Sequence, residues 1–219
     1  MPAAAWPNWV LGNHDRPRVA SRVGQAQARV AAMLMLTLRG TPTLYYGDEI
    51  GMRQIAIAAD QVRDPFEKNV PGIGVGRDGC RTPMQWNAKA HSGFTTGEPW
   101  LPLGNDYIHD NVANLSTETR SVLNLYRALI RLRRATAELE AGSYATVATT
   151  GDLLAYRREY EGNALLIVLN LGANPISIGS DTMAFRGEIL LSTNLDRSGE
   201  TAPSGLDLRG NEGLIIRLS

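Results

Sequence analysis

The stretch that decides the fold is WVLGNHDRP, residues 9–17. Its first residues are apolar and end at Gly12, which is typical of a short buried strand. The residues that follow are polar and end at a proline, and this pattern indicates a loop that leaves the strand. The sequence therefore predicts a strand over residues 9–12, with the acidic residue Asp15 just beyond its end.

A helix and a second strand are predicted next. Residues 25–38 are rich in Ala, Met and Leu and are apolar on nearly every face, which indicates a buried helix. Gly40 suits the left-handed position that ends a helix, and Pro42 prevents its continuation. Residues 43–46 predict another short strand. This order predicts one βαβ crossover of a parallel sheet, in which functional groups gather at the carboxyl ends of the strands.

The middle of the chain is irregular. Residues 52–118 show no regular periodicity and hold many Gly, Pro, Asn and Asp residues. A connection of this length more often carries functional residues than merely joins two elements. Regular order returns at residues 121–134, where apolar residues on one face and arginines in the last turn predict an amphipathic helix.

A run of short strands is predicted toward the C-terminus. Good hairpin turns stand at residues 150–152 and 161–163. The predicted strands cover residues 144–149, 153–159, 164–171, 187–192 and 213–218. We therefore predict two domains, residues 1–137 and residues 138–219, of which the second is a small antiparallel β domain.

Composition and charge narrow the classes of function. Lys and Arg number 22, and Asp and Glu also number 22, so the charge balance predicts no nucleic-acid partner. The longest apolar run, residues 30–38, is far too short to span a membrane, so no membrane partner is predicted. The single cysteine, Cys80, forms no internal disulfide, which favours a reducing compartment and hence a cytoplasmic location. His91 and His109 lack partners at metal-ligand spacing, so we predict no metal and no other cofactor.

The loop at Asn13, His14 and Asp15 is the first candidate for chemistry. A carboxylate at the end of a strand can stabilise positive charge, and an imidazole beside it can hydrogen-bond a hydroxyl group. In the alternative interpretation Asp15 caps a turn and His14 is a solvated side chain, since so short a motif recurs by chance.

The second candidate is RDGCRTPMQW, residues 77–86. The guanidinium N–H groups of arginine are rigid hydrogen-bond donors that can bind sugar hydroxyl groups. The flat ring of Trp86 can pack against the C–H face of a sugar. In the alternative interpretation ion pairs pin this loop, and Trp86 forms its small core. Cys80 is predicted to be a small buried side chain. Asp48 and Glu49 form an acidic pair whose members would point to opposite sides of a strand, and a structural role is favoured for them.

These stretches occur in an order that resembles the α-amylase family of glycoside hydrolases, family thirteen. The match rests on residues 9–18, 40–52 and 81–86, and it is closest to α-glucosidases and oligo-1,6-glucosidases. The resemblance implies an α/β plus all-β fold: the C-terminal part of a (β/α)8 barrel followed by an antiparallel β-sandwich domain. It makes residues 9–12 barrel strand seven and residues 43–46 barrel strand eight.

The resemblance also implies roles for individual residues. Asp15 is implied to be the catalytic carboxylate that stabilises the transition state, and His14 to bond the hydroxyl groups of the same sugar. Arg81 is implied to bind the non-reducing end, and Arg16 and Arg77 are also present for this role. The implied substrate is an α-glucosidic oligosaccharide or disaccharide, which is cleaved with retention through a covalent glycosyl-enzyme.

In this family the nucleophile and the acid/base stand at the ends of barrel strands four and five. Only twelve residues precede Asn13, so we expect a C-terminal fragment whose partner, the N-terminal barrel half, is missing and which is inactive alone. Two non-catalytic alternatives remain: a scaffold like the heavy subunits of amino-acid transporters, and a β domain that binds glucans. The aromatic residues available for glucan binding are Tyr144, Tyr156, Tyr160 and Phe185.

Overall fold

The computed structural model describes residues 5–180, 185–202 and 205–219. The chain divides into two compact units. The first unit comprises Met1–Trp9, Ala26–Pro42 and Leu125–Ser219, and the second unit comprises Val10–Gln25 and Thr43–Asn124. The predicted domains, 1–137 and 138–219, divide the chain elsewhere and stay a prediction.

The predicted order of strand, helix and strand is present near the N-terminus. β1 (Asn8–Val10) and β2 (Thr41–Thr43) pair in a two-stranded sheet, and α1 (Val19–Thr37) lies between them in the chain. Both strands begin and end earlier than predicted, at 8–10 instead of 9–12 and at 41–43 instead of 43–46. α1 also begins before residue 25, because two helical segments join across Gly24, whose φ of 81° and ψ of 159° are not helical. The sequence pattern misses the first segment because polar residues interrupt its apolar periodicity.

Gly40 lies between α1 and β2, but not in the predicted left-handed helical conformation. Its φ is 139°, whereas left-handed helical residues have φ near about 57°. A Cβ atom at this position would lie 2.5 Å from the carbonyl oxygen of Pro7 and 2.6 Å from the indole nitrogen of Trp9. Glycine is therefore required both by the positive φ and by the close approach of neighbouring atoms.

We expect Gly40→Ala to lower the free energy of unfolding by about 2 kcal/mol, because the new methyl group adds an overlap to the backbone strain. Gly151→Ala is the matched control: Gly151 also has a positive φ, of 57°, but a Cβ atom added there would have nothing within 4 Å. The free energy of unfolding of the control should fall by about 1 kcal/mol, because backbone strain is the only cost there. Urea unfolding measures the free energy of unfolding of both variants. Equal losses of stability would contradict the role of the atomic overlap at Gly40.

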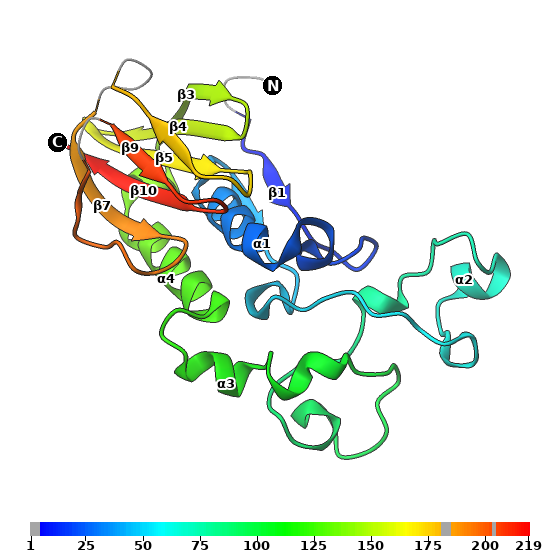
Figure 1. Cartoon of the computed structure of the whole chain (residues 1–219). Helices are drawn as coiled ribbons and strands as arrows, with labels where there is room; N and C mark the ends of the chain where they lie inside the picture. Colours follow the sequence, from blue (N-terminus) through cyan, green and yellow to red (C-terminus); the bar gives the residue numbers. More distant parts are fainter. Residues whose placement is uncertain (1–4, 181–184, 203–204) are drawn as a thin grey trace. The chain divides into compact units, whose positions relative to one another are not determined.

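The C-terminal region forms an antiparallel sheet of six strands in the order β3-β4-β5-β10-β7-β8 (Figure 1). The strands are β3 (Ser143–Thr150), β4 (Leu153–Tyr160), β5 (Asn163–Asn170), β7 (Gly187–Ser192), β8 (Thr201–Ala202) and β10 (Gly213–Leu218). The β3–β4 and β4–β5 hairpins confirm the predicted turns. All the strands except β8 confirm predicted ones, and β8 is too short to show a periodicity.

A second, two-stranded sheet joins β6 (Ile176–Ile178) to β9 (Leu206–Leu208). The sequence pattern misses both strands because three residues are too few for an alternation to stand out. Buried side chains of the two sheets share one core, to which the large sheet contributes Leu166 and Ile216 and the small sheet Leu206. The antiparallel β region is thus confirmed, and its arrangement as a sandwich stays a prediction.

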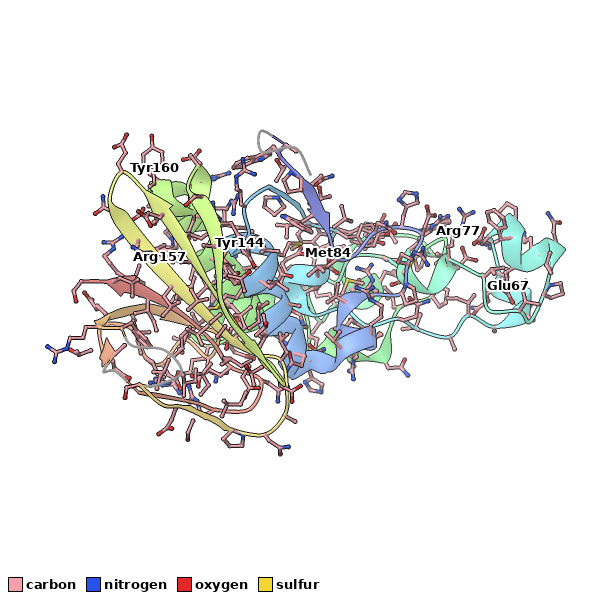
Figure 2. All side chains as sticks on the ribbon, turned by 90° about the horizontal axis from the view of Figure 1, so that it is seen from above. Glu67, Arg77, Met84, Tyr144, Arg157 and Tyr160 are labelled. Atoms are coloured by element: carbon pink, nitrogen blue, oxygen red, sulfur yellow. The ribbon has the colours of Figure 1, made fainter. Side chains whose placement is uncertain are left out.

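The remaining elements are helical. α4 (Val122–Ala135) confirms the predicted amphipathic helix, and α5 (Ala137–Glu140) follows it. Between β2 and α4 the elements are η1 (Asp48–Ile50), η2 (Ala59–Gln61), α2 (Pro65–Asn69), η3 (Asp78–Cys80), η4 (Ala90–Gly93), η5 (Asn105–Ile108) and α3 (Val112–Thr117). Their small core includes Met84, labelled in Figure 2, together with Ile50 and Leu115. None of the helices in the described ranges combines the length and hydropathy that a membrane crossing requires.

Candidate active site

Asp15 lies in the loop that leaves β1, within the second unit. The side-chain oxygen of Asn13 accepts the backbone N–H of Asp15 at 2.9 Å. A short turn of this type, closed by an asparagine side chain, orients the backbone that carries Asp15. The side chain of Asp15 is 49% exposed, so its carboxylate is accessible to a ligand.

Three side chains converge on the Asp15 carboxylate. Its Oδ1 lies 3.1 Å from Nη1 of Arg77 and 3.1 Å from Nη2 of Arg81, and its Oδ2 lies 3.2 Å from Nε2 of His14. Nε of Arg81 also donates to the carbonyl oxygen of His14 at 2.8 Å. The structure thus brings the three predicted site residues together and adds Arg77 to them.

The carboxylate of Asp15 is held in its ionised form. Partial desolvation raises its pKa, but the hydrogen bond from Arg77, the charge of His14 and the hydrogen bond from Arg81 outweigh this effect. The net pKa of Asp15 lies below its ordinary value. Asp15 is therefore negatively charged at neutral pH, which suits it to stabilise a positive charge on a ligand.

Arg77 is held in turn by Asp64, whose side chain is fully buried. Asp64 accepts the backbone N–H of Arg77 at 2.8 Å, its Nε at 2.9 Å and its Nη2 at 2.8 Å. These bonds hold the pKa of Asp64 far below its ordinary value. Asp64 also caps α2 by accepting the N–H of Phe66 at 3.1 Å. Asp64 was not among the predicted site residues, although an aspartate followed by proline is a helix-start signal.

The loop of residues 77–86 combines features of both sequence interpretations. Asp78 is buried and accepts the backbone N–H groups of Arg63 and Asp64 at 2.6 and 2.8 Å, so ion pairs and hydrogen bonds do pin this loop. Trp86, however, is 48% exposed, so it does not form the small core of the alternative interpretation. Cys80 is buried, as predicted. In the part of the chain that the structure describes, no three His, Cys, Asp or Glu residues are grouped as a metal site requires.

Two cavities flank this cluster of side chains, and both lie within the second unit. The Asp15 cavity, of about 670 Å³, is lined by residues that include Asp15, Arg16, Gln54, Phe66, Val75 and Arg77. The aromatic cavity, of about 600 Å³, is lined by residues that include His14, Tyr46, Arg81, Trp86, Phe94 and Trp100. Cavities of this size are large enough for a small ligand.

Asp48 and Glu49 lie in the turn η1 and not on a strand, so the alternating geometry of a strand does not apply to them. Asp48 is 6% exposed, and its Oδ1 has no hydrogen-bond partner among the residues that the structure describes. Burial raises the pKa of Asp48 to about 6, although the nearby charge of Arg18 acts in the opposite direction. The carboxylate of Asp48 is therefore inaccessible to a ligand in the structure.

Arg18 is a buried cation that sequence analysis did not identify. It is 0% exposed, and its guanidinium carbon lies 5.0 Å and 4.6 Å from the ring centroids of Tyr45 and Tyr46. Its Nη1 donates to the carbonyl oxygen of Tyr46. Stacking of this type partly compensates a cation for its loss of water. No local sequence signal distinguishes Arg18 from the exposed arginines around it.

Only two of the four aromatic residues considered for glucan binding are exposed in the structure. Tyr156 is 0% exposed, and Phe185 is partly buried against the sheet core. Tyr144 and Tyr160 remain exposed on β3 and β4 (Figure 2). Tyr144 also packs on Tyr156, with ring centroids 5.2 Å apart.

Comparison with known protein families assigns a family to the chain. The family model of the α-amylase catalytic domain matches residues 1–142. The chain belongs to the α-amylase family, a family of glycoside hydrolases.

Three similar proteins illustrate the range of this family. Oligo-1,6-glucosidase of Halalkalibacterium halodurans is 35% identical over 189 residues, which cover 75% of this chain and 34% of the relative. Amino acid transporter heavy chain SLC3A1 of Homo sapiens is 33% identical over 223 residues, which cover 99% of this chain and 31% of the relative. The crystal structure of trehalulose synthase MutB from Pseudomonas mesoacidophila MX-45 matches with a TM-score of 0.88 and 31% identity, over 100% of this chain and 44% of that one. The chain therefore spans about a third of the length of the two curated relatives.

Proposed function

We propose that this chain forms part of a retaining α-glucosidase that removes terminal α-linked glucose from short oligosaccharides or disaccharides. Asp15 stabilises the oxocarbenium-like transition state of this reaction. The observation that supports this role is a half-exposed, ionised carboxylate that Arg77, Arg81 and His14 orient. In this proposal β1 and β2 are barrel strands seven and eight, and residues 138–219 form the β-sandwich domain.

The neighbours of Asp15 bind the sugar. His14 bonds a hydroxyl group of the glucose that Asp15 contacts. All three guanidinium nitrogens of Arg77 are bonded to Asp64 or Asp15. Nη1 of Arg81, by contrast, makes no hydrogen bond within the described residues. A free pair of N–H groups is what a sugar hydroxyl needs, so Arg81 is the substrate-binding arginine and Arg77 supports Asp15.

We further propose that the 219-residue chain does not hydrolyse glucosides by itself. Besides Asp15, retaining hydrolysis needs two more carboxyl groups, a nucleophile and an acid/base that stand about 5 Å apart. Among the described residues that line the Asp15 cavity, Asp15 is the only acidic one. Asp64 and Asp78 are buried and bonded to N–H groups, and Glu49 lines the aromatic cavity instead.

A non-catalytic scaffold is the second candidate function. It is favoured by the similarity to an amino acid transporter heavy chain, which extends over 99% of this chain. A scaffold of this kind needs no sugar at Asp15. Binding of glucose therefore distinguishes the two candidates.

The proposal is tested by titrating glucose into the chain in a calorimeter. We expect Asp15→Asn to weaken glucose binding at least about tenfold, because a charged hydrogen-bond acceptor contributes about 1.5–3 kcal/mol. Asp60→Asn is the matched control, since Asp60 is exposed in η2 and lines neither cavity. It should bind like the wild type.

The outcomes separate the parts of the proposal. Equal glucose affinity in the wild type and in Asp15→Asn would contradict the site. Complete absence of binding would favour the scaffold. Release of p-nitrophenol from its α-glucoside by the wild type, abolished in Asp15→Asn, would disprove only the inactivity of the isolated chain.

A further inference from the structure

The residues around Asp15 are divided between the two cavities. Asp15 and Arg77 line the Asp15 cavity, whereas His14 and Arg81 line the aromatic cavity. Both His14 and Arg81 are in direct contact with Asp15. A ligand that touches this whole cluster therefore extends from one cavity into the other, and its two ends meet different walls.

The Asp15 cavity has one charged wall and one apolar wall. Asp15 and Arg77 supply charge and hydrogen-bonding groups. Phe66 and Val75 supply apolar surface, and they remain 55% and 43% exposed. The Phe66 ring also lies 4.5 Å from the guanidinium carbon of Arg77. A wall of this composition is typical of pockets that receive a flat or ring-shaped group with one apolar face.

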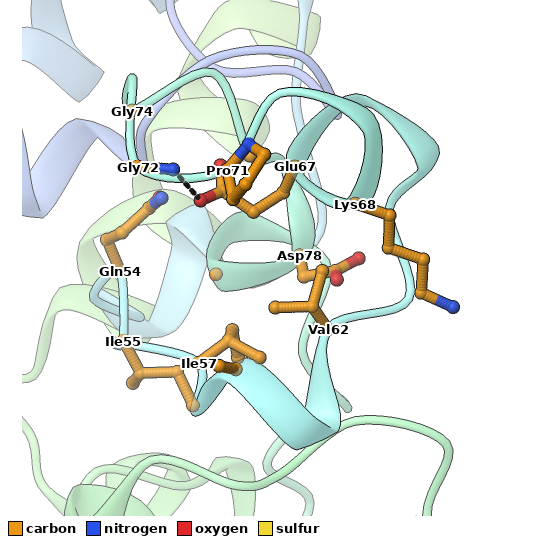
Figure 3. Close-up of a pocket in the computed structure, with 13 residues that line it drawn as sticks. Gln54, Ile55, Ile57, Val62, Glu67, Lys68, Pro71, Gly72, Gly74 and Asp78 are labelled. Atoms are coloured by element: carbon orange, nitrogen blue, oxygen red, sulfur yellow. Dashed lines mark hydrogen bonds between the residues drawn. The ribbon is translucent and has the colours of Figure 1, made fainter.

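The apolar wall is anchored on both sides. Phe66 belongs to α2, and its N–H bonds to the buried Asp64. Val75 lies in the loop of residues 71–76, where Oε1 of Glu67 accepts the N–H of Gly72 at 3.0 Å (Figure 3). The same loop borders a neighbouring cavity of about 680 Å³, drawn in Figure 3. The loop is thus a partition between two cavities, and Val75 faces the one that contains Asp15.

We propose that Phe66 and Val75 form the subsite for the leaving group of an α-glucoside. They select leaving groups with an apolar face, such as an aryl group or the C–H face of a second sugar ring. This inference rests on the proposed function. His14 and Arg81 hold the glucose on the side of the aromatic cavity, so the group attached to its anomeric carbon extends past Asp15 toward Phe66.

The test compares two ligands in the intact chain by calorimetry: glucose, and p-nitrophenyl 1-thio-α-glucoside, whose sulfur linkage resists hydrolysis. We expect the wild type to bind the thioglucoside more tightly than glucose. The ratio of the two affinities should fall about tenfold in Phe66→Ala, because the stacked aromatic contact is lost. Phe66→Tyr should restore the ratio, since it keeps the flat ring.

Ile73→Ala is the matched control. Ile73 is a 63% exposed apolar residue of the same loop and lines neither the Asp15 cavity nor its neighbour. The control should keep the wild-type ratio. An unchanged ratio in Phe66→Ala, or an equal fall in Ile73→Ala, would overturn the leaving-group subsite while glucose binding still supports the site at Asp15. Failure of the wild type to bind glucose would overturn the proposed function, and this inference with it.

Discussion

Replacing Arg158 with methionine is expected to lower the free energy of unfolding by about 4 kcal/mol. Arg158 is 0% exposed, and its guanidinium donates to four backbone carbonyl groups within the first unit. The carbonyls belong to Thr37, Leu139, Gly142 and Ser143. Methionine fills a similar volume but donates to none of them, so buried acceptors lose a charged donor.

The position of Arg158 adds to this effect. Thr37 is the last residue of α1, and a cation at the carboxyl end of a helix is stabilised by the helix dipole. Burial and the nearby Arg133 lower the pKa of Arg158 to about 10, so the side chain is still charged at neutral pH. The hydrogen bonds of Arg158 thus connect the end of α1 to the residues that precede and begin β3.

Urea unfolding followed by circular dichroism measures the loss. Arg157→Met is the matched control, because Arg157 is the neighbouring residue, its side chain is 43% exposed, and it forms an ion pair with Glu159 at 3.3 Å. A surface pair of this kind contributes about 0–1 kcal/mol. If the two variants lost the same stability, the carbonyl network of Arg158 would not be the cause.

Asp48→Asn is expected to make the chain more stable at neutral pH, by up to about 3 kcal/mol. Burial raises the pKa of Asp48 to about 6 in the folded chain, from an ordinary value of 3.8. Each unit of pKa shift corresponds to about 1.4 kcal/mol. Between these two values the unfolded chain has lost the proton and the folded chain still holds it, so the stability of the wild type falls as the pH rises.

The pH dependence of this gain is the decisive measurement. Asparagine carries no ionisable proton. The difference in the free energy of unfolding between the variant and the wild type should therefore be near zero at about pH 4. It should grow as the pH rises toward 6 and reach a plateau above about pH 7. Urea unfolding at several pH values, followed by tryptophan fluorescence, measures this difference in the free energy of unfolding. A gain of constant size across this range would rule out the buried charge as its origin.

Local sequence patterns were sufficient where the physical cause is local. The alternating and apolar runs that became β4, β5, β7 and β10 were predicted within a few residues. The strands β6, β8 and β9 were not, because two or three residues carry no readable period. The earlier start of α1 was also missed, because polar residues interrupt the apolar periodicity of its first segment.

The candidate site was predicted in part. Asp15, His14 and Arg81 were recognised from short motifs and from their order along the chain. Asp64 and Phe66 were overlooked, because their importance depends on contacts with Arg77 that are made 11 or more residues away. A structural role for Asp48 was favoured and stays a prediction, and its buried oxygen without a partner among the described residues is a property of packing that no spacing of residues displays.

Residue types and their order were enough to identify the family, the antiparallel β region and the loop that carries Asp15, since these follow from local periodicity and from motifs. The contacts that make a site of that loop were decided by folding. Arg77 and Arg81 reach Asp15 across 62 and 66 residues of chain. The length of chain between two residues does not specify how they meet, and packing of α2 and the loop of residues 71–76 determines which side chains face the carboxylate.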